Sequence, residues 1–240
     1  MPVFVDCHTH MVPSGDDGVG SVSEARALCR EAYARGTRIL FATPHVWPHL
    51  PLEPEREAAI RKAYAELRPQ VGLELRLGFE LTPTAALLND DPRRYVLEGT
   101  DAVLMEVPFL GSTAIVFALA ERIAQEGLRP VIAHPERTES VLQDPSLATK
   151  LAERGWLLQV NATSLLGRHG PEIEELGWRL LEEREATLVA SDGHRSTRPP
   201  YLDTAFALAG ARFGESALAL FDGSALGIRT GAPGAARLPS

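Results

Sequence analysis

The chain has 240 residues, a length that suits one large α/β domain or two small ones. Hydrophobic residues make up 45% of it and charged residues 23%, as in an ordinary soluble globular protein. The net charge of -8 argues against a general nucleic-acid binder, because such proteins need clustered cations to displace phosphate counterions. The two cysteines, Cys7 and Cys29, allow one disulfide at most, which excludes a disulfide-rich fold and fits a reducing cytoplasm.

Strands and helices are predicted to alternate along the chain. Short apolar or β-branched runs indicate strands, and apolar residues repeating every three or four positions indicate helices. In chain order we expect a strand at 3–5, a helix at 23–35, a strand at 38–42, a helix at 54–67, strands at 74–78 and 102–106, a helix at 113–126, a strand at 130–133, a helix at 145–154, a strand at 157–160, a helix at 171–183, a strand at 187–190 and a last helix from Asp203 onward. The N-terminal run is expected to be a strand and not a signal peptide, and the longest apolar stretch, 114–120, is too short to span a membrane.

This alternation defines the expected fold class, α/β. About seven repeats of strand and helix predict parallel strands joined by crossover helices. A closed or nearly closed βα barrel is the preferred architecture, and a doubly wound sheet is the alternative. No long linker or charge run divides the chain, so residues 1–230 are expected to form a single domain. Residues 231–240, rich in Gly, Ala and Pro, are expected to be a frayed tail.

Residues able to bind metal ions recur at the predicted ends of strands. His8 and His10 follow the first strand two residues apart, so both side chains point to the same side of an extended chain. The full set of candidates is His8, His10, Asp17, His45, Glu80, Glu106, His134, Asp192 and His194. In βα barrels the site forms where strands end, and buried carboxylates need a compensating charge. These residues therefore predict a multi-metal hydrolytic site.

Each candidate also has an explanation that involves no ligand. The motif Asp16-Asp17-Gly18 favours a plain turn. Arg137 and Arg198, which lie beside candidate ligands in the sequence, would by default be solvated surface residues. His49 and His169 stand alone, and a lone histidine is rarely a ligand. The repetition of ligands at six strand ends, and not any one residue, favours the metal site.

Cys29 and Arg35 match the Cys-x5-Arg spacing of the thiolate phosphatases. That chemistry needs a loop whose backbone N–H groups surround a phosphate, usually one that contains glycine. Here the five intervening residues, 30–34, favour a helix and include no glycine. A catalytic Cys29 is therefore not expected. The sequence also contains no GxGxxG or GxxxxGK loop, which argues against a nucleotide cofactor.

Six short motifs resemble those of a known family. They are His8-Thr9-His10, Asp16-Asp17-Gly18, Ala42-Thr43-Pro44-His45, Gly78-Phe79-Glu80, His134-Pro135-Glu136-Arg137 and Ser191-Asp192-Gly193-His194. In order and spacing they look like the PHP (polymerase and histidinol phosphatase) superfamily. Within it they are most similar to the bacterial manganese-dependent protein tyrosine phosphatases of capsule and exopolysaccharide operons. The likeness covers nearly the whole chain and implies a distorted (β/α)7 barrel of the PHP type.

The resemblance implies that the candidate ligands hold three divalent metal ions, with Mn²⁺ as the expected metal and Fe or Zn as alternatives that suit the same donors. The first ion would be held by His8, His10, Glu80 and Asp192, the second by Glu80, Glu106 and His134, and the third by Asp17, His45 and His194. Arg137 and Arg198 would bind the phosphate oxygens, with Arg195 as the alternative to Arg198. A metal-activated hydroxide would hydrolyse the phosphomonoester.

The resemblance also implies a substrate and a setting. The substrate would be a phosphotyrosine protein, in particular an autophosphorylating tyrosine kinase of exopolysaccharide export, and the enzyme would act in the cytoplasm without membrane insertion. Three alternatives are a PHP phosphatase of histidinol phosphate or a nucleotide phosphate, an amidohydrolase, and a non-catalytic metal-binding partner module. The amidohydrolase is disfavoured because many of these enzymes use a strand-borne lysine carbamate, whereas Lys62 and Lys150, the only lysines, lie in predicted helices.

Overall fold

The computed structural model describes residues 2–108 and 113–229. Every paired strand in these residues runs parallel to its neighbour, in two sheets of order β1-β2-β4 and β3-β5-β6-β7-β8-β9. The strands are β1 (Phe4–Thr9), β2 (Thr37–Ala42), β3 (His45–Val46), β4 (Glu74–Leu77), β5 (Glu80–Leu81), β6 (Ala102–Glu106), β7 (Arg129–Ala133), β8 (Leu157–Asn161) and β9 (Leu188–Ala190). The α/β fold class is confirmed. The tail predicted at 231–240 lies outside the described residues.

Two of the seven predicted strands, 38–42 and 74–78, are each followed, after a two-residue interruption, by a short strand that was not predicted. Residues 43–44 separate β2 from β3, and residues 78–79 separate β4 from β5. Backbone hydrogen bonding continues at the interruption, because the Gly78 N–H donates to the Ala42 carbonyl (2.9 Å). Pro44 has no N–H to contribute to a ladder, which is one reason for the break. Counted as continuous strands, β2–β3 and β4–β5 give the seven strands expected from the sequence.

The first and last strands approach each other at one point. An isolated parallel bridge pairs Thr9, at the end of β1, with Gly193, which follows β9. The His10 N–H donates to the Gly193 carbonyl (2.6 Å), and the Asp192 N–H donates to the His8 carbonyl (3.0 Å). Within the described residues this bridge, and not a continuous ladder, joins the two ends of the barrel. It also brings two pairs of candidate ligands together.

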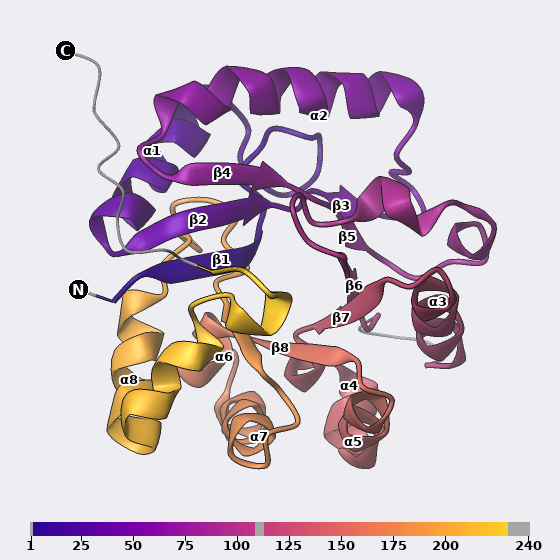
Figure 1. Cartoon of the computed structure of the whole chain (residues 1–240), viewed down its shortest axis with the longest axis vertical. Helices are drawn as coiled ribbons and strands as arrows, with labels where there is room; N and C mark the ends of the chain where they lie inside the picture. Colours follow the sequence, from indigo (N-terminus) through magenta and orange to yellow (C-terminus); the bar gives the residue numbers. More distant parts are fainter. Residues whose placement is uncertain (1, 109–112, 230–240) are drawn as a thin grey trace.

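Helices lie around the outside of the strands (Figure 1). The longer ones are α1 (Val22–Ala34), α2 (Pro54–Leu67), α3 (Ala114–Gln125), α5 (Ser146–Glu153), α7 (Pro171–Glu182) and α8 (Asp203–Phe213), close to the six predicted. Unpredicted short elements are α4 (Glu139–Gln143), α6 (Ala162–Leu165) and the 3₁₀ helices η1 (Arg68–Gln70), η2 (Leu87–Asn89), η3 (Pro92–Tyr95), η4 (Pro135–Arg137), η5 (Gly214–Leu220) and η6 (Ser224–Leu226). Local chemistry sets the boundaries of α1: the Ser21 hydroxyl accepts from the Glu24 N–H, and Gly36 is left-handed (φ 106°) just beyond its end.

Apolar side chains fill both sides of the strands, as expected where helices cover a parallel sheet. One set of buried side chains, including Val103 of β6, packs with helix residues such as Leu28 of α1. A second set, including Ala102 and Leu104 of β6, packs on the opposite, inner side. Side chains alternate along a strand, so Glu106 continues this inner row at the end of β6. The interior of the barrel therefore leads from a packed apolar region to polar residues at the strand ends.

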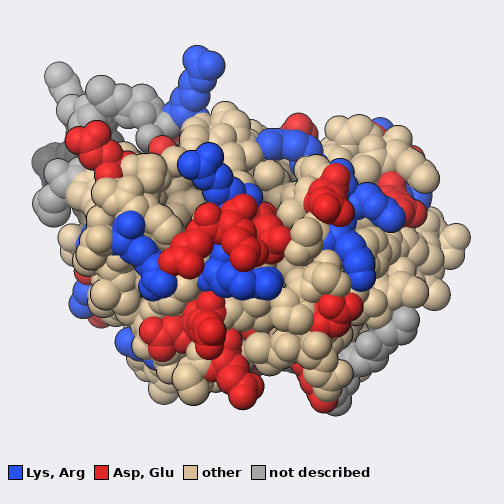
Figure 2. Space-filling view, turned by 90° about the horizontal axis from the view of Figure 1, so that it is seen from below, with Lys and Arg blue, Asp and Glu red and all other residues tan. Residues whose placement is uncertain are grey.

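Acidic and basic side chains are mixed on the outer surface. Figure 2 shows a face on which carboxylates gather in a cluster bordered by basic side chains. Ion pairs among the described residues include Arg212 with Glu182 (2.5 Å) and Arg129 with Asp101 (2.6 Å). Among the described residues, no helix is both long enough and apolar enough to cross a membrane.

Candidate metal centre

All nine residues predicted as metal ligands converge where the strands end. They come from β1 and the loop after it (His8, His10, Asp17), from β3 (His45), β5 (Glu80) and β6 (Glu106), from the residue after β7 (His134) and from the loop after β9 (Asp192, His194). Eight of the nine are buried, and the exception is Asp17, whose side chain is 57% exposed. Burying so many ionisable groups together is costly unless they pair with one another or bind a cation.

Glu80 lies at the centre of the histidines. Its Oε2 atom is 3.0 Å from Nε2 of His8, 3.3 Å from Nε2 of His10 and 3.0 Å from Nδ1 of His45. Its Oε1 atom is 3.0 Å from Nε2 of His134. Burial raises the pKa of Glu80, but the charges of His8 and His45 outweigh this effect and hold the pKa well below its usual value. An ionised carboxylate that faces imidazole nitrogens with both oxygens could hold a cation together with these imidazoles.

The buried ligand atoms also support a metal site because some of them are poorly satisfied. Glu80 Oε2, His10 Nδ1 and His194 Nε2 are buried and have no hydrogen bond of good geometry among the described residues. Their nearest polar neighbours are other candidate ligands or carboxylates at ion-pair distance. Buried polar atoms without hydrogen bonds are rare in proteins. Bound cations would account for these atoms, and the imidazole and carboxylate set suits Mn, Fe or Zn.

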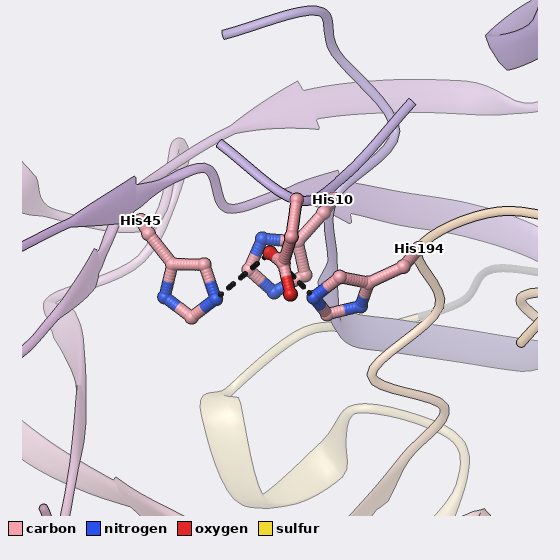
Figure 3. Close-up of side chains that lie close together, drawn as sticks. His10, His45 and His194 are labelled. Carbon is pink, nitrogen blue, oxygen red and sulfur yellow. Dashed lines mark ion pairs between the residues drawn. The ribbon is translucent and has the colours of Figure 1, made fainter. Parts of the chain in front are cut away.

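His10 also belongs to an outer group with His45, His194 and Asp17. Figure 3 shows the imidazoles of His10, His45 and His194 close together, with dashed lines marking the ion pairs that His45 and His194 make with a carboxylate. The Oδ1 atom of Asp17 is 3.1 Å from Nε2 of His194 and 3.6 Å from Nε2 of His45. The centroid of the His10 ring lies 4.2 Å from that of His45 and 3.9 Å from that of His194. This group includes the exposed Asp17, so it faces the solvent side of the site.

Asp192 connects the ligands to the arginines. Its Oδ1 atom is 3.5 Å from Nε2 of His8 and of His10. Its Oδ2 atom accepts a hydrogen bond from Nη1 of Arg137 (2.8 Å) and lies 3.4 Å from Nη1 of Arg198. Burial raises the pKa of Asp192, but the positive charges around it, that of His8 first, lower the pKa well below its usual value. The ionised carboxylate thus faces the imidazoles with one oxygen and the guanidinium groups with the other.

The ligand atoms form three overlapping groups among the described residues, and within each group they lie within 4.8 Å of one another. The groups are His8, Glu80 and His134; His8, His10 and Asp192; and His10, Asp17, His45 and His194. Compared with the sets expected from the resemblance, His10 also joins the outer group, and Glu106 falls in none. Glu106 instead accepts a hydrogen bond from the Thr82 hydroxyl. Burial, together with the nearby charge of Glu80, raises the pKa of Glu106 to about 8.

Two of the ligands lie in the left-handed region of backbone conformation. His134 has φ 35° and Asp192 has φ 52°, which is uncommon for residues other than glycine. Among the described residues, Arg184 is the only other non-glycine residue with positive φ. Such conformations are costly and cluster at functional sites. At both ligands the chain turns sharply just where the strand ends.

The Asp16-Asp17-Gly18 motif forms a turn and also contributes to the site. The Gly18 N–H donates to Oδ1 of Asp16 (3.0 Å), and Oδ2 of Asp16 accepts from the His45 N–H (2.9 Å). A Cβ atom at position 18 would lie 2.6 Å from Cβ of His10, so the close approach of the two segments requires glycine. The two interpretations of this motif, a turn and a source of ligands, are therefore compatible.

β8 contributes no predicted ligand but supplies two amide side chains behind the ligands. The His8 Nδ1–H donates to Oε1 of Gln159 (2.9 Å), and the Gln159 amide donates to Oδ1 of Asn161 (2.9 Å). The Asn161 amide then donates to Oδ2 of Asp192 (2.8 Å). This arrangement keeps Nε2 of His8 free as the ligand atom. Neither amide was predicted from the sequence as part of the site, although polar residues two apart in an apolar strand lie on the same face.

The ligands open into a pocket of about 250 Å³. Its lining comprises Asp17, His45, Trp47, Glu106, His134, Arg137, Asp192, His194 and Arg198. Arg137 and Arg198 therefore both reach the pocket beside the ligands. Arg195, the alternative to Arg198, instead donates from Nε to the Asp17 carbonyl (3.2 Å). The pocket combines anionic and imidazole donors, two guanidinium groups and one aromatic wall.

Three residues that were expected to have no role in the site are not part of the pocket lining. His49 is exposed, with its ring 5.1 Å from that of Trp47. His169 shares a hydrogen bond with the Thr163 hydroxyl (2.9 Å). Cys29 is buried in α1, and burial raises the pKa of its thiol to about 12. A buried, protonated thiol is not a nucleophile, so the Cys-x5-Arg spacing has no catalytic meaning here.

Parallel strands with imidazoles and carboxylates at their ends define the chain as a metal-dependent hydrolase of the α/β barrel type. The same fold occurs in the inactive dihydroorotase-like domain of a CAD-like multifunctional protein from Chaetomium thermophilum, with a TM-score of 0.61 at 10% identity over 95% of this chain and 80% of that one. Lys62 and Lys150 lie on α2 and α5, so neither is the strand-borne lysine of an amidohydrolase carbamate.

The family is defined by closer relatives. The family model described as capsular polysaccharide synthesis, CpsB/CapC, matches residues 4–221, and the chain belongs to this family. It is 32% identical over 197 residues to the tyrosine-protein phosphatase YwqE of Bacillus subtilis. This alignment covers 80% of this chain and 77% of the relative. It is 29% identical over 225 residues to the tyrosine-protein phosphatase CpsB of Streptococcus agalactiae serotype III, with 88% and 92% covered.

The structural comparison agrees with the family. A solved structure from work on YwqE of Bacillus subtilis and CpsB of Streptococcus pneumoniae, described as unique metal-dependent tyrosine phosphatases, matches with a TM-score of 0.79. The two chains are 30% identical, and the match covers 89% of each. The family expected from the six sequence motifs is confirmed.

Proposed function

We propose that this protein is a metal-dependent phosphomonoester hydrolase that removes phosphate from phosphotyrosine in proteins. The enzyme uses no cysteine nucleophile. One observation carries the proposal: six of the nine predicted metal ligands and two arginines line a single pocket, and the other three ligands, His8, His10 and Glu80, are buried beside them. A phosphate ester needs cations to neutralise its oxygens and donors to orient it, and both are available there. The names of the relatives, which are tyrosine-protein phosphatases, support the substrate class.

Three divalent ions are assigned to the site, with Mn²⁺ as the preferred metal and Fe or Zn as alternatives. The first is assigned to His8, His10, Glu80 and Asp192, the second to Glu80, Glu106 and His134, and the third to Asp17, His45 and His194. The close approach of donors within three groups supports a division into three sites, with His10 common to two of the groups. Glu106 lies in none of these groups, so its place in the second set rests on the resemblance. When bound, the ions supply Lewis acidity toward phosphate oxygens and an activated water.

Arg137 and Arg198 are assigned to phosphate binding. Both direct a guanidinium nitrogen toward Oδ2 of Asp192, at 2.8 and 3.4 Å. This contact holds both guanidinium groups at the pocket, where their other N–H groups could bind a phosphate, because a planar guanidinium can bind two oxygens at once. The side chains are only 15% and 24% exposed, so their hydrogen bonds to an anion are stronger than they would be in open solvent.

The natural substrate is proposed to be an autophosphorylating tyrosine kinase of exopolysaccharide export, dephosphorylated in the cytoplasm. The description of the family as one of capsular polysaccharide synthesis supports this setting. Residues 1–230 are proposed to act as one phosphatase domain, since strands from both ends of this range contribute ligands to the same site. The alternative is a phosphatase of the same superfamily that acts on a small molecule, and substrate preference distinguishes it from a protein tyrosine phosphatase.

The test is turnover of p-nitrophenyl phosphate, a phosphotyrosine peptide, histidinol phosphate and nucleotide monophosphates by the purified protein with Mn²⁺. We expect the phosphotyrosine peptide to be preferred over histidinol phosphate and the nucleotide monophosphates. The Cys29→Ser variant should retain activity, and the His134→Ala variant should lose it. Preference for histidinol phosphate or a nucleotide would replace the proposed substrate. Loss of turnover in Cys29→Ser with retention in His134→Ala would overturn the metal mechanism itself.

A further inference from the structure

A second concave site adjoins the metal pocket. It is a groove of about 520 Å³ between the loop that joins β3 to α2 and the short helices η2 and η3. Trp47 lines both the groove and the metal pocket. The groove is lined in part by the buried side chains of Leu52 and Leu87 and by the exposed Pro48 and Ala86. An apolar surface therefore begins where the wall of the metal pocket ends.

Trp47 is held in place between the two sites. Its ring stacks on that of His45, a predicted metal ligand, with centroids 4.2 Å apart and planes at 23°. On its other side it stacks on His49 at 5.1 Å and 21°. The backbone beyond it turns back on itself, because the Leu50 N–H donates to the Trp47 carbonyl (3.0 Å). The position of Trp47 is thus coupled to the ligand set.

Two arginines fix the loop that forms the groove wall. Arg56 of α2 donates to the carbonyls of His45 (2.8 Å) and Leu50 (2.9 Å). Arg94 of η3 donates to the Leu52 carbonyl (2.6 Å) and pairs with Glu57 (2.6 Å). The loop is therefore tied to a helix at one end and to a 3₁₀ helix at the other. Preformed grooves of this kind bind a chain at a lower ordering cost than a mobile surface does.

The acidic residues of the groove restrict what can bind there. Glu53 is exposed on the lining, and Asp90 lies on the opposite side, where it accepts a hydrogen bond from the Tyr95 hydroxyl. Arg94, the basic residue of the lining, is already paired with Glu57 (2.6 Å) and Asp90 (3.5 Å), so the exposed Glu53 carboxylate would repel an acidic ligand side chain. An apolar side chain would instead cover Leu52 and Leu87 and lose its contact with water.

We infer that this groove binds the residues next to phosphotyrosine in the substrate protein and favours an apolar residue over an acidic one at that position. The inference rests on the proposed function, since it is the phosphotyrosine in the metal pocket that delivers the flanking chain past Trp47. A protein substrate continues beyond its phosphotyrosine, so its neighbouring residues must leave the pocket over the rim. Trp47 is the rim residue that the groove shares.

The experiment compares kcat/KM for two phosphotyrosine peptides, one with leucines and one with aspartates beside the phosphotyrosine, and for p-nitrophenyl phosphate. The groove is filled by Ala86→Trp and, as a second variant, by Asn89→Trp; both positions are exposed, so each protein is expected to fold. Ala58→Trp, at an exposed position of α2 that does not line the groove, is the matched control. Thermal unfolding of every variant confirms that its fold is retained.

We expect the wild type to prefer the leucine peptide by about tenfold, as burial of a flanking apolar side chain predicts. The quantity compared is kcat/KM for the leucine peptide divided by kcat/KM for p-nitrophenyl phosphate. Either groove variant should lower this ratio by about tenfold, whereas Ala58→Trp should leave it within about twofold of the wild-type ratio. Equal use of both peptides by the wild type, or an unchanged ratio in both groove variants, would overturn the inference while leaving phosphatase activity intact. If the wild type hydrolyses none of the three substrates, the proposed function fails and the groove assignment fails with it.

Discussion

Gln159 offers the most informative single substitution, because it contacts a ligand without being one. Its Oε1 atom accepts from the buried His8 ring, and its amide donates to the buried Asn161. Gln159→Leu keeps the size of the side chain but leaves the His8 Nδ1–H and the Asn161 Oδ1 without these partners. Two such losses predict a metal-free protein about 2–4 kcal/mol less stable. They also predict a His8 ring that is no longer oriented toward the other ligands.

Metal affinity is the direct readout of this perturbation. Substitution of a residue that orients a metal ligand lowers affinity by about 10–100-fold, equivalent to about 1.4–2.8 kcal/mol. Isothermal titration of metal-stripped protein with Mn²⁺ measures the effect, and urea unfolding of the same stripped protein measures the loss of stability. Gln159→Glu retains the acceptor for His8 and should recover most of the affinity, whereas Gln125→Leu, on the exposed surface of α3, should change neither quantity. Unchanged Mn²⁺ affinity in Gln159→Leu would refute the role assigned to the amides.

Three further outcomes follow from the geometry of the site. Arg137→Ala is expected to lower kcat/KM for a phosphotyrosine peptide by about 10²–10³-fold in steady-state kinetics. Arg137→Lys should recover little of this activity, because a lysine does not bind two phosphate oxygens in the bidentate way of a guanidinium. Full activity of the lysine variant would contradict the bidentate role. Gly18→Ala places a methyl group 2.6 Å from Cβ of His10. Chemical denaturation is expected to show a loss of about 1–3 kcal/mol in stability, and metal binding should weaken as well. Wild-type stability and metal affinity in this variant would show that glycine is not required at this turn. Cys7 and Cys29 are buried, and burial raises the pKa of both thiols. Mass spectrometry should therefore find neither thiol modified by iodoacetamide until the protein is unfolded. Rapid modification of the native protein would contradict this burial.

The fold was largely predictable because it depends on local patterns. Each of the seven runs predicted as strands contains a strand, and the six long helices lie close to their predicted positions. The short elements α4 and α6 were missed, since four or five residues show no periodicity. The interruptions at 43–44 and 78–79 were also missed. They divide strands whose apolar pattern is otherwise continuous, and the partner strands that keep them in register are distant in sequence.

The predicted metal ligands are recognisable in the sequence for a reason that does not apply to the residues around them. His8 and His10 stand out because imidazoles two apart after an apolar run are chemically distinctive. Gln159 is an ordinary polar residue whose importance comes from a contact with His8, 151 positions away. Arg56 is similar, because its role depends on backbone carbonyls of a loop whose path the sequence does not specify. Contacts of this kind appear only once the strands are arranged in space.

Metal-dependent hydrolysis of phosphotyrosine is the central claim, and a metal titration tests it most directly. The protein is stripped with a chelator, dialysed, and assayed on a phosphotyrosine peptide as Mn²⁺ is added back, with bound metal measured in parallel. The site described here predicts no turnover in the stripped protein and recovery of activity in step with metal bound at the His and carboxylate cluster. Full turnover by the stripped protein, or metal binding without any hydrolysis of phosphotyrosine, would contradict it.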